Sequence, residues 1–103
     1  MKIEVVASRL AELGNPARLR AFRLLVQAGD EGLPVGEIQA HLKIPSSTLS
    51  HHIAHLVSAG LITQTREGRV LRCRVDFRAT AEVLRFLMNN CCAGVVATPS
   101  AEG

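Results

Sequence analysis

The sequence IPSSTLSHHIAHLVSAGLI, at residues 44–62, contains the helix signals from which the fold can be predicted. Pro45 lacks a backbone N–H and suits a turn, and Ser46 or Ser47 can cap the first N–H groups of a helix that begins there. The apolar residues then recur at spacings of three and four, the period of an amphipathic helix, up to Gly60. They are Leu49, Ile53, Leu56 and Val57. The stretch therefore predicts a helix with one face in a core.

The opposite face of this helix is small and polar, and it contains no acidic residue. Hydroxyls and neutral imidazoles can donate and accept hydrogen bonds, and the absence of carboxylates avoids repulsion from phosphates. Such a face suits contact with nucleic acid, although a solvated helix face is the alternative that this helix alone leaves open. The face consists of Ser47, Thr48, His51, Ala54, His55 and Ser58.

The composition favours one small domain with an aliphatic core. The chain has 103 residues, of which 48% are hydrophobic, with three Phe and no Trp or Tyr. Its net charge of +3 is a mild basic balance that favours a polyanionic partner only weakly. No apolar run is long enough to span a bilayer and no signal-peptide pattern follows Met1, so we expect a cytoplasmic protein with no membrane partner.

Three helices are predicted before the central one. Residues 3–14 carry a helical apolar stripe, and Asn15 as cap with Pro16 at the first helical position starts a second helix. Residues 35–42 form a brief third helix, and a short helix, a tight turn and a longer helix are typical of a helix-turn-helix, whose second helix enters the major groove. On the second helix we expect Leu19, Phe22, Leu25 and Val26 to be buried and Arg18, Arg20 and Arg23 to form a cationic face.

A β-hairpin is predicted after the central helix. Residues 61–65 are strand-forming, residues 70–75 alternate apolar side chains with Arg, and residues 66–69 form the tip. Gly68 supplies the positive φ that a tight turn needs. We expect a two-stranded wing whose arginines reach the phosphate backbone. These arginines are Arg66, Arg69 and Arg72.

The last predicted helix runs from about residue 77 to residue 90, capped by Asp76, and is apolar almost all round. A terminal helix on so small a domain cannot bury its whole circumference within its own chain, so a second copy is expected against it. We therefore predict one domain over residues 1–92, mainly α with a small β-hairpin. Residues 93–103 are expected to be a flexible tail.

In this order of elements the chain resembles the ArsR family of winged helix-turn-helix repressors, over nearly everything from Glu4 to Cys92. The resemblance rests on LGNPARLR at residues 13–20, on residues 46–62 with Ser-His-His at 50–52, and on REGR at 66–69. It implies a homodimer joined through the first and last helices, which binds a palindromic operator in double-stranded DNA and is released by an inducer. Major-groove contacts would come from Ser46, Ser47, Thr48, Ser50 and His51.

The adjacent Cys91 and Cys92 are the candidate inducer site. Soft thiolates bind soft ions, and neighbouring thiolates can chelate As(III) or Sb(III). Arsenic-responsive relatives look similar in having a Cys-Cys pair here with a further Cys a few residues on, but residues 93–103 contain no cysteine. Either two sulfurs and a non-protein ligand suffice or Cys73 contributes, although the strand alternation favours Cys73 as a buried apolar residue.

Other chemistries have less support in the sequence. His51 and His55 lie one helical turn apart and could clamp a metal, but no Cys or carboxylate nearby in the sequence completes such a site, so DNA contact or solvation is favoured. His52 is expected to be a structural residue at the core edge. No phosphate-binding loop, metal-hydrolase motif or nucleophile elbow points to an enzyme, and no cofactor is predicted. A repressor in which the same thiols are oxidised, and a protein-interaction module that has lost DNA binding, stay open.

Overall fold

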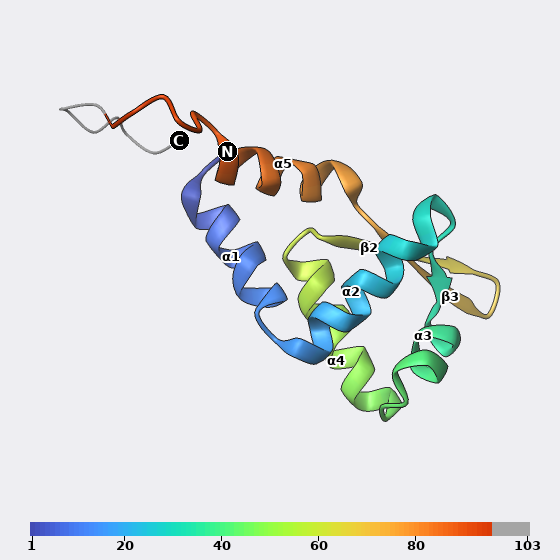
Figure 1. Ribbon diagram of the computed structural model, residues 1–103. Coiled ribbons are helices and arrows are strands. Elements are labelled where there is room, and N and C mark those ends of the chain that lie inside the picture. Colours follow the sequence, from blue (N-terminus) through green and yellow to red (C-terminus); the bar gives the residue numbers. More distant parts are fainter. Residues whose placement is uncertain (96–103) are drawn as a thin grey trace.

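The computed structural model describes residues 1–95, which form a helical domain with a small sheet (Figure 1). The predicted fold class and the order of elements are confirmed. The helices are α1 (Ile3–Leu13), α2 (Pro16–Ala28), α3 (Val35–Leu42), α4 (Ser46–Ser58) and α5 (Phe77–Met88), with a 3₁₀ turn η1 (Gly29–Glu31). The strands are β1 (Leu33–Pro34), β2 (Ile62–Glu67) and β3 (Val70–Val75). Most of the tail expected at residues 93–103 lies outside the described residues.

Helix starts follow the predicted capping at two of three places. Asn15 Oδ1 accepts a hydrogen bond from the Arg18 N–H at 3.1 Å, and Asp76 Oδ1 accepts one from the Ala79 N–H at 3.0 Å. The prediction that Ser46 or Ser47 caps α4 is wrong. Pro45 itself takes the extended capping position, with φ −60° and ψ 147°, so both serines already lie in the first helical turn.

The sheet has three strands where the sequence predicted two. β3 lies between β2 and β1, and both pairings are antiparallel, with Leu33 opposite Cys73. β1 was missed because a two-residue strand is too short to show alternation, and Pro34 argues against a strand except at an edge. The hairpin tip is also tighter than predicted, because Glu67 pairs with Val70 and leaves only Gly68 and Arg69 in the turn.

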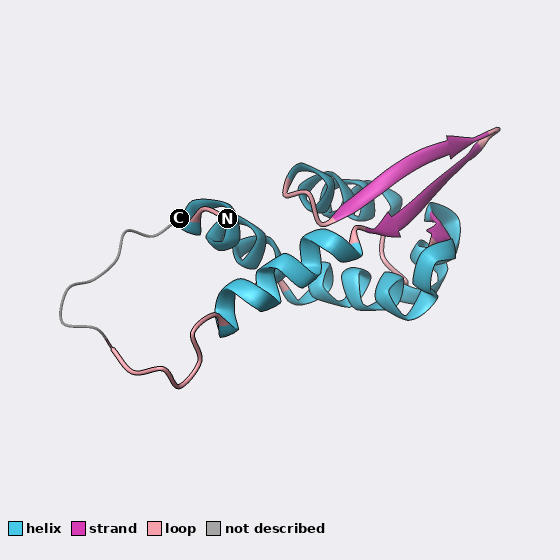
Figure 2. Ribbon diagram, turned by 90° about the horizontal axis from the view of Figure 1, so that it is seen from above, coloured by secondary structure: helices cyan, strands magenta, loops and turns pink. Residues whose placement is uncertain are grey.

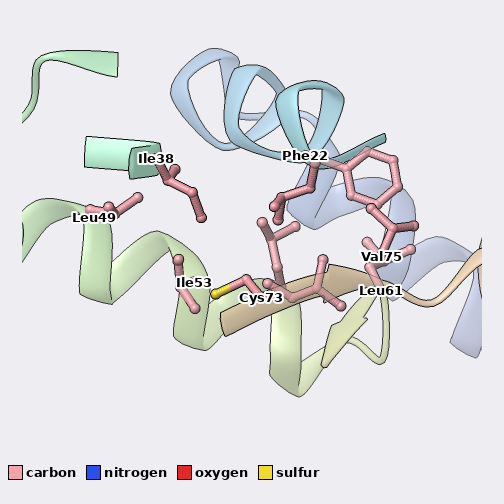
Figure 3. Packing of buried hydrophobic residues seen from close by; sticks show 10 residues of the cluster. Phe22, Ile38, Leu49, Ile53, Leu61, Cys73 and Val75 are labelled. Carbon is pink, nitrogen blue, oxygen red and sulfur yellow. The ribbon is translucent and has the colours of Figure 1, made fainter. Parts of the chain in front are cut away.

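An aliphatic core joins α2, α3 and α4 to the sheet (Figure 3). Ile38, Leu49 and Leu56 are fully buried, as is Cys73, which confirms the prediction that this cysteine is a packing residue. On α2 the buried face differs from the predicted one. Phe22 and Leu25 are buried, but Leu19 and Val26 are 39% and 40% exposed, and Ala21 and Arg18 take their places in the interior. The last helix ends at Met88, two residues before the predicted Asn90, because the backbone turns extended at Asn89.

Gly32 fixes the approach of β1 to β3. Its φ is +64°, and a Cβ added there would lie 2.0 Å from the Cys73 carbonyl oxygen. Gly29, at the end of α2, has nearly the same backbone conformation, with φ +70°, but its Cβ would meet no atom within 4 Å. The two glycines therefore separate the cost of backbone strain from the cost of a clash.

We expect Gly32→Ala to destabilise the protein more than Gly29→Ala. Backbone strain in this region costs about 1–3 kcal/mol for either alanine. Gly32→Ala adds the cost of pushing β1 from β3, about 1–3 kcal/mol more. Urea unfolding monitored by circular dichroism measures both. Equal destabilisation of the two variants would contradict the close packing of Gly32 against β3.

Candidate nucleic-acid interface and thiol pair

The predicted DNA-contacting residues of α4 lie together on its exposed side. Leu49, Ile53 and Leu56 are turned into the core together with His52, and this directs the opposite side of the helix outward. The five residues predicted to enter the major groove are all exposed: Ser46, Ser47, Thr48, Ser50 and His51. Three of them lie in the first turn of α4, where N–H groups free of side-chain caps and the positive end of the helix dipole favour phosphate.

The wing places two arginines at its tip. β2 and β3 extend beyond the helices as a hairpin (Figure 2). Arg66 and Arg69 are exposed there, and within residues 1–95 neither side chain is in an ion pair or a side-chain hydrogen bond. Their guanidinium groups are therefore available to a polyanion.

Arg72 and Arg74 are instead held within the wing by Glu67. Arg72 Nε donates to Glu67 Oε1 at 2.8 Å, and Arg74 Nη2 donates to Oε2 at 3.1 Å. Both also bind carbonyls of η1, because Arg72 Nη1 donates to Glu31 O and Arg74 Nε to Asp30 O, each at 3.2 Å. The hydrogen bond from Arg72, followed by that from Arg74, lowers the pKa of Glu67. Arg72, which the sequence put among the phosphate contacts, thus has part of its donor set already engaged.

His52 lies on the buried side of α4, which confirms the prediction of a structural histidine. Arg18 Nε donates to His52 Nδ1 at 3.3 Å, and Arg18 Nη1 donates to Glu12 Oε2 at 3.0 Å. The prediction that Arg18 lies on a cationic face is wrong, because this pairing satisfies its charge inside the protein, where it is only 9% exposed. Burial first, and then the charge of Arg18, lowers the pKa of His52.

The same carboxylate joins α1 to two histidines of α4, the exposed His51 and the half-buried His55. Glu12 Oε2 lies 2.7 Å from His55 Nδ1, and His55 Nε2 lies 3.1 Å from His51 Nε2. No pattern in the sequence indicated this contact, because Glu12 lies on a different helix and far from both histidines along the chain. A chain of polar contacts thus runs from the interior at His52 to the surface at His51.

Cys91 and Cys92 form an exposed pair directly after α5. Their Sγ atoms are 2.8 Å apart, and Cys92 has a positive φ of 65°. The hydrogen bond with Cys92 raises the pKa of the Cys91 thiol. Cys73 does not join them, because it is fully buried and its Sγ accepts a hydrogen bond from Gln64 Nε2 at 3.7 Å. Within residues 1–95 no three His, Cys, Asp or Glu side chains are grouped to hold a metal ion.

Known proteins that are similar in sequence or structure are described as helix-turn-helix proteins or transcriptional regulators. A helix-turn-helix domain family matches residues 13–65. The chain is 32% identical, over 77% of its length and 60% of the relative's, to a protein of Halobacterium salinarum named as a putative arsenical resistance operon repressor. It is 36% identical, over 65% of its length and 73% of the relative's, to an HTH-type transcriptional regulator of Methanocaldococcus jannaschii. A crystal structure of a possible transcriptional regulator for arsenical resistance superposes with a TM-score of 0.68 at 29% identity, over 78% of this chain and 80% of that one.

The chain belongs to the ArsR family of winged helix-turn-helix regulators.

This membership places the ArsR-family chain among transcriptional regulators and not among enzymes. The chain spans less than two thirds of the length of the Halobacterium relative, at 60%. In the part of the chain that the structure describes, none of the helices has the length and apolarity needed to cross a membrane.

We expect the ArsR-family domain to lose stability below pH 6.5 through His52. An unfolded histidine has the ordinary pKa of 6.5, whereas burial lowers the pKa in the folded state. Stability is therefore full above pH 6.5 and declines as the pH falls toward the lowered pKa, by up to about 1.4 kcal/mol per pH unit. Urea unfolding between pH 4.5 and 8 should show a shallower decline for His52→Gln. The same substitution of the exposed His41 is the control, and an unchanged slope in His52→Gln would contradict this role.

Proposed function

We propose that this protein is a transcriptional repressor that binds a palindromic operator as a homodimer and is released when As(III) or Sb(III) binds Cys91 and Cys92. The observation that carries the DNA-binding part is the exposed, hydroxyl-rich face of α4, which has no acidic residue and lies on the same domain as the exposed Arg66 and Arg69. Hydroxyl and imidazole groups there can meet base edges, while the wing arginines meet phosphates.

A second copy of the chain is the proposed partner of the α1 and α5 surface. These helices lie at the end of the molecule away from the wing (Figure 1), and they leave large apolar side chains uncovered. Leu84, Leu87 and Met88 of α5 are 59%, 54% and 64% exposed, and Ile3 and Val5 of α1 are 42% and 41% exposed. Covering such a patch favours association. A two-fold dimer would present two α4 helices to half-sites about 34 Å apart.

The thiol pair supports a soft metalloid as inducer. Arsenious acid, As(OH)₃, can exchange two hydroxyls for the two thiolates, forming two As–S bonds and releasing two water molecules that carry off the thiol protons. The remaining hydroxide is then the third ligand, so no third cysteine is needed. The two thiols are neighbours on an exposed segment, so a single metalloid can reach both without bringing distant parts of the chain together.

The position of the pair suggests how binding is transmitted. Cys91 N–H donates to the Met88 carbonyl at 3.0 Å, so the thiol segment is fastened to the last turn of α5. Rearrangement of this segment around a metalloid would move the end of the proposed dimer helix. The spacing of the two α4 helices in the dimer would change with it. Coupling free energies between such sites are typically about 1–3 kcal/mol.

Oxidation of the same thiols is the less favoured inducing event. Adjacent Cα atoms are about 3.8 Å apart across a trans peptide, whereas disulfides ordinarily join Cα atoms about 4.4–6.8 Å apart. A disulfide between Cys91 and Cys92 would therefore be strained, while a metalloid can bridge the sulfurs without joining them directly.

We expect replacement of either wing-tip arginine to weaken DNA binding mainly through electrostatics. For Arg66→Ala and Arg69→Ala, the slope of log K against log salt concentration should become shallower by about 1 for each phosphate that the protein no longer neutralises. Fluorescence anisotropy with a labelled promoter fragment, between 50 and 300 mM salt, measures this slope. Arg23→Ala, which removes the same charge from α2, is the matched control.

A module that has lost DNA binding would behave differently. Its association with the promoter fragment would be undetectable, or equal for promoter and unrelated DNA, and its salt slope would not change in Arg66→Ala and Arg69→Ala. Either result would contradict the repressor proposal.

We expect arsenite to lower operator affinity by about 5- to 150-fold in the wild-type protein. Cys91→Ser and Cys92→Ser should each abolish this response while leaving metalloid-free DNA binding intact, because neither thiol touches the α4 face. Anisotropy titrations of arsenite and of antimonite into the preformed complex measure the release.

Cys73→Ala is the matched control, since it removes a thiol from the core and should keep the arsenite response. A normal response in Cys91→Ser and Cys92→Ser would place the inducer site elsewhere. Release by hydrogen peroxide but not by arsenite would instead support the redox alternative.

A further inference from the structure

The two surface histidines of α4 converge in a way that DNA contact does not require. His51 and His55 are one helical turn apart, and their Nε2 atoms lie 3.1 Å from each other, with ring centroids 4.4 Å apart and ring planes at 73°. Two imidazole nitrogens bound to one cation at about 2.0–2.1 Å are separated by about 2.8–3.4 Å, for bond angles between octahedral and tetrahedral. The observed spacing lies within that range.

Glu12 supplies an independent reason to regard this pair as a ligand set. The Glu12 carboxylate accepts hydrogen bonds, so the short 2.7 Å contact puts the ring proton of His55 on Nδ1. The lone pair of His55 is then on Nε2, directed toward His51. A carboxylate behind a histidine is the usual outer partner of a metal-binding imidazole, because it fixes the tautomer and raises the basicity of the ligating nitrogen.

Glu12 is itself held in place by the interior of the protein. Arg18 Nη1 donates to the same Oε2 atom at 3.0 Å, and Arg18 is anchored in turn by His52. The orientation of His55 is thus set by three residues from α1, α2 and α4. Exposed side chains that are only solvated need no such support.

We propose that His51 and His55 bind one divalent transition-metal cation through their Nε2 atoms, with Glu12 as the positioning residue behind His55. Imidazole favours borderline cations such as Cu²⁺, Ni²⁺ and Zn²⁺ over Mg²⁺ or Ca²⁺. Because the described residues offer only two ligands, water completes the coordination sphere, and the site is weaker than one with three or four protein ligands. This site is separate from the thiol pair in both position and ligand chemistry. The proposal rests on the imidazole geometry and does not depend on operator binding or arsenite sensing.

Calorimetric titration of Cu²⁺ and of Zn²⁺ into the untagged full-length Cys91→Ser/Cys92→Ser protein tests the site without interference from the exposed thiols. We expect one cation per chain and tighter binding of Cu²⁺ than of Zn²⁺. His51→Ala and His55→Ala should each weaken binding at least tenfold, and the double variant should be little weaker than either single variant, because the two ligands act as a chelate.

His41→Ala, which removes an exposed histidine from α3, is the matched control and should bind as the parent does. Glu12→Gln should weaken the affinity by about 10-fold or more, as removal of an outer partner does. Circular dichroism verifies that each variant is folded. Unchanged binding in His51→Ala or His55→Ala, or an equal weakening in His41→Ala, would overturn the proposal. Unchanged binding in Glu12→Gln would overturn the positioning role. Failure to bind operator DNA, by contrast, would refute only the proposed function.

Discussion

One side of α4 is buried in the core, and the placement of its polar surface and of the wing follows from that burial. Leu49 and Leu56 are fully buried and Ile53 is 3% exposed, so the helix has a single permitted rotation about its axis. The core that receives these residues is built from α2, α3 and the sheet (Figure 3). Because the helical period is 3.6 residues, fixing the apolar side also fixes which hydroxyls and imidazoles face outward. The chemistry of the candidate DNA surface is therefore a consequence of core packing.

The wing depends on this core through β3. Cys73 and Val75 face the interior, and the alternate residues Arg72 and Arg74 face outward and bracket Glu67. These exposed ion pairs contribute little to the free energy of unfolding, but they hold the two strands and η1 in one orientation. Their more important effect is to distinguish two pairs of arginines in the wing. They engage Arg72 and Arg74 internally and leave Arg66 and Arg69 available for a polyanion.

One set of polar contacts, separate from the ion pairs of the wing, links side chains of three helices. Glu12, Arg18 and His52 form a partly buried set that ties α1 and α2 to α4. This set also reaches the surface, because Glu12 contacts His55. The contact orients the His55 ring, whose Nε2 lies beside that of His51. The thiols of Cys91 and Cys92, just after α5, take part neither in this set nor in the ion pairs of the wing. The two proposed ligand sites, one with soft thiols and one with borderline imidazoles, thus lie at separate places on one small domain.

The five helices, the hairpin and their order could be predicted from the sequence, because each of these elements has its own apolar period. Asn15 and Asp76 as caps, α3 over Val35–Leu42, β3 over Val70–Val75, and the burial of Cys73 were all predictable from such local signals. Contacts between distant segments were not. Only the tertiary structure shows that Leu33 pairs with Cys73 and that Arg18 is buried. The same holds for the contact of Glu12 with His55. Their partners lie far apart along the chain, and no local periodicity encodes which polar side chains a packed core will bring together.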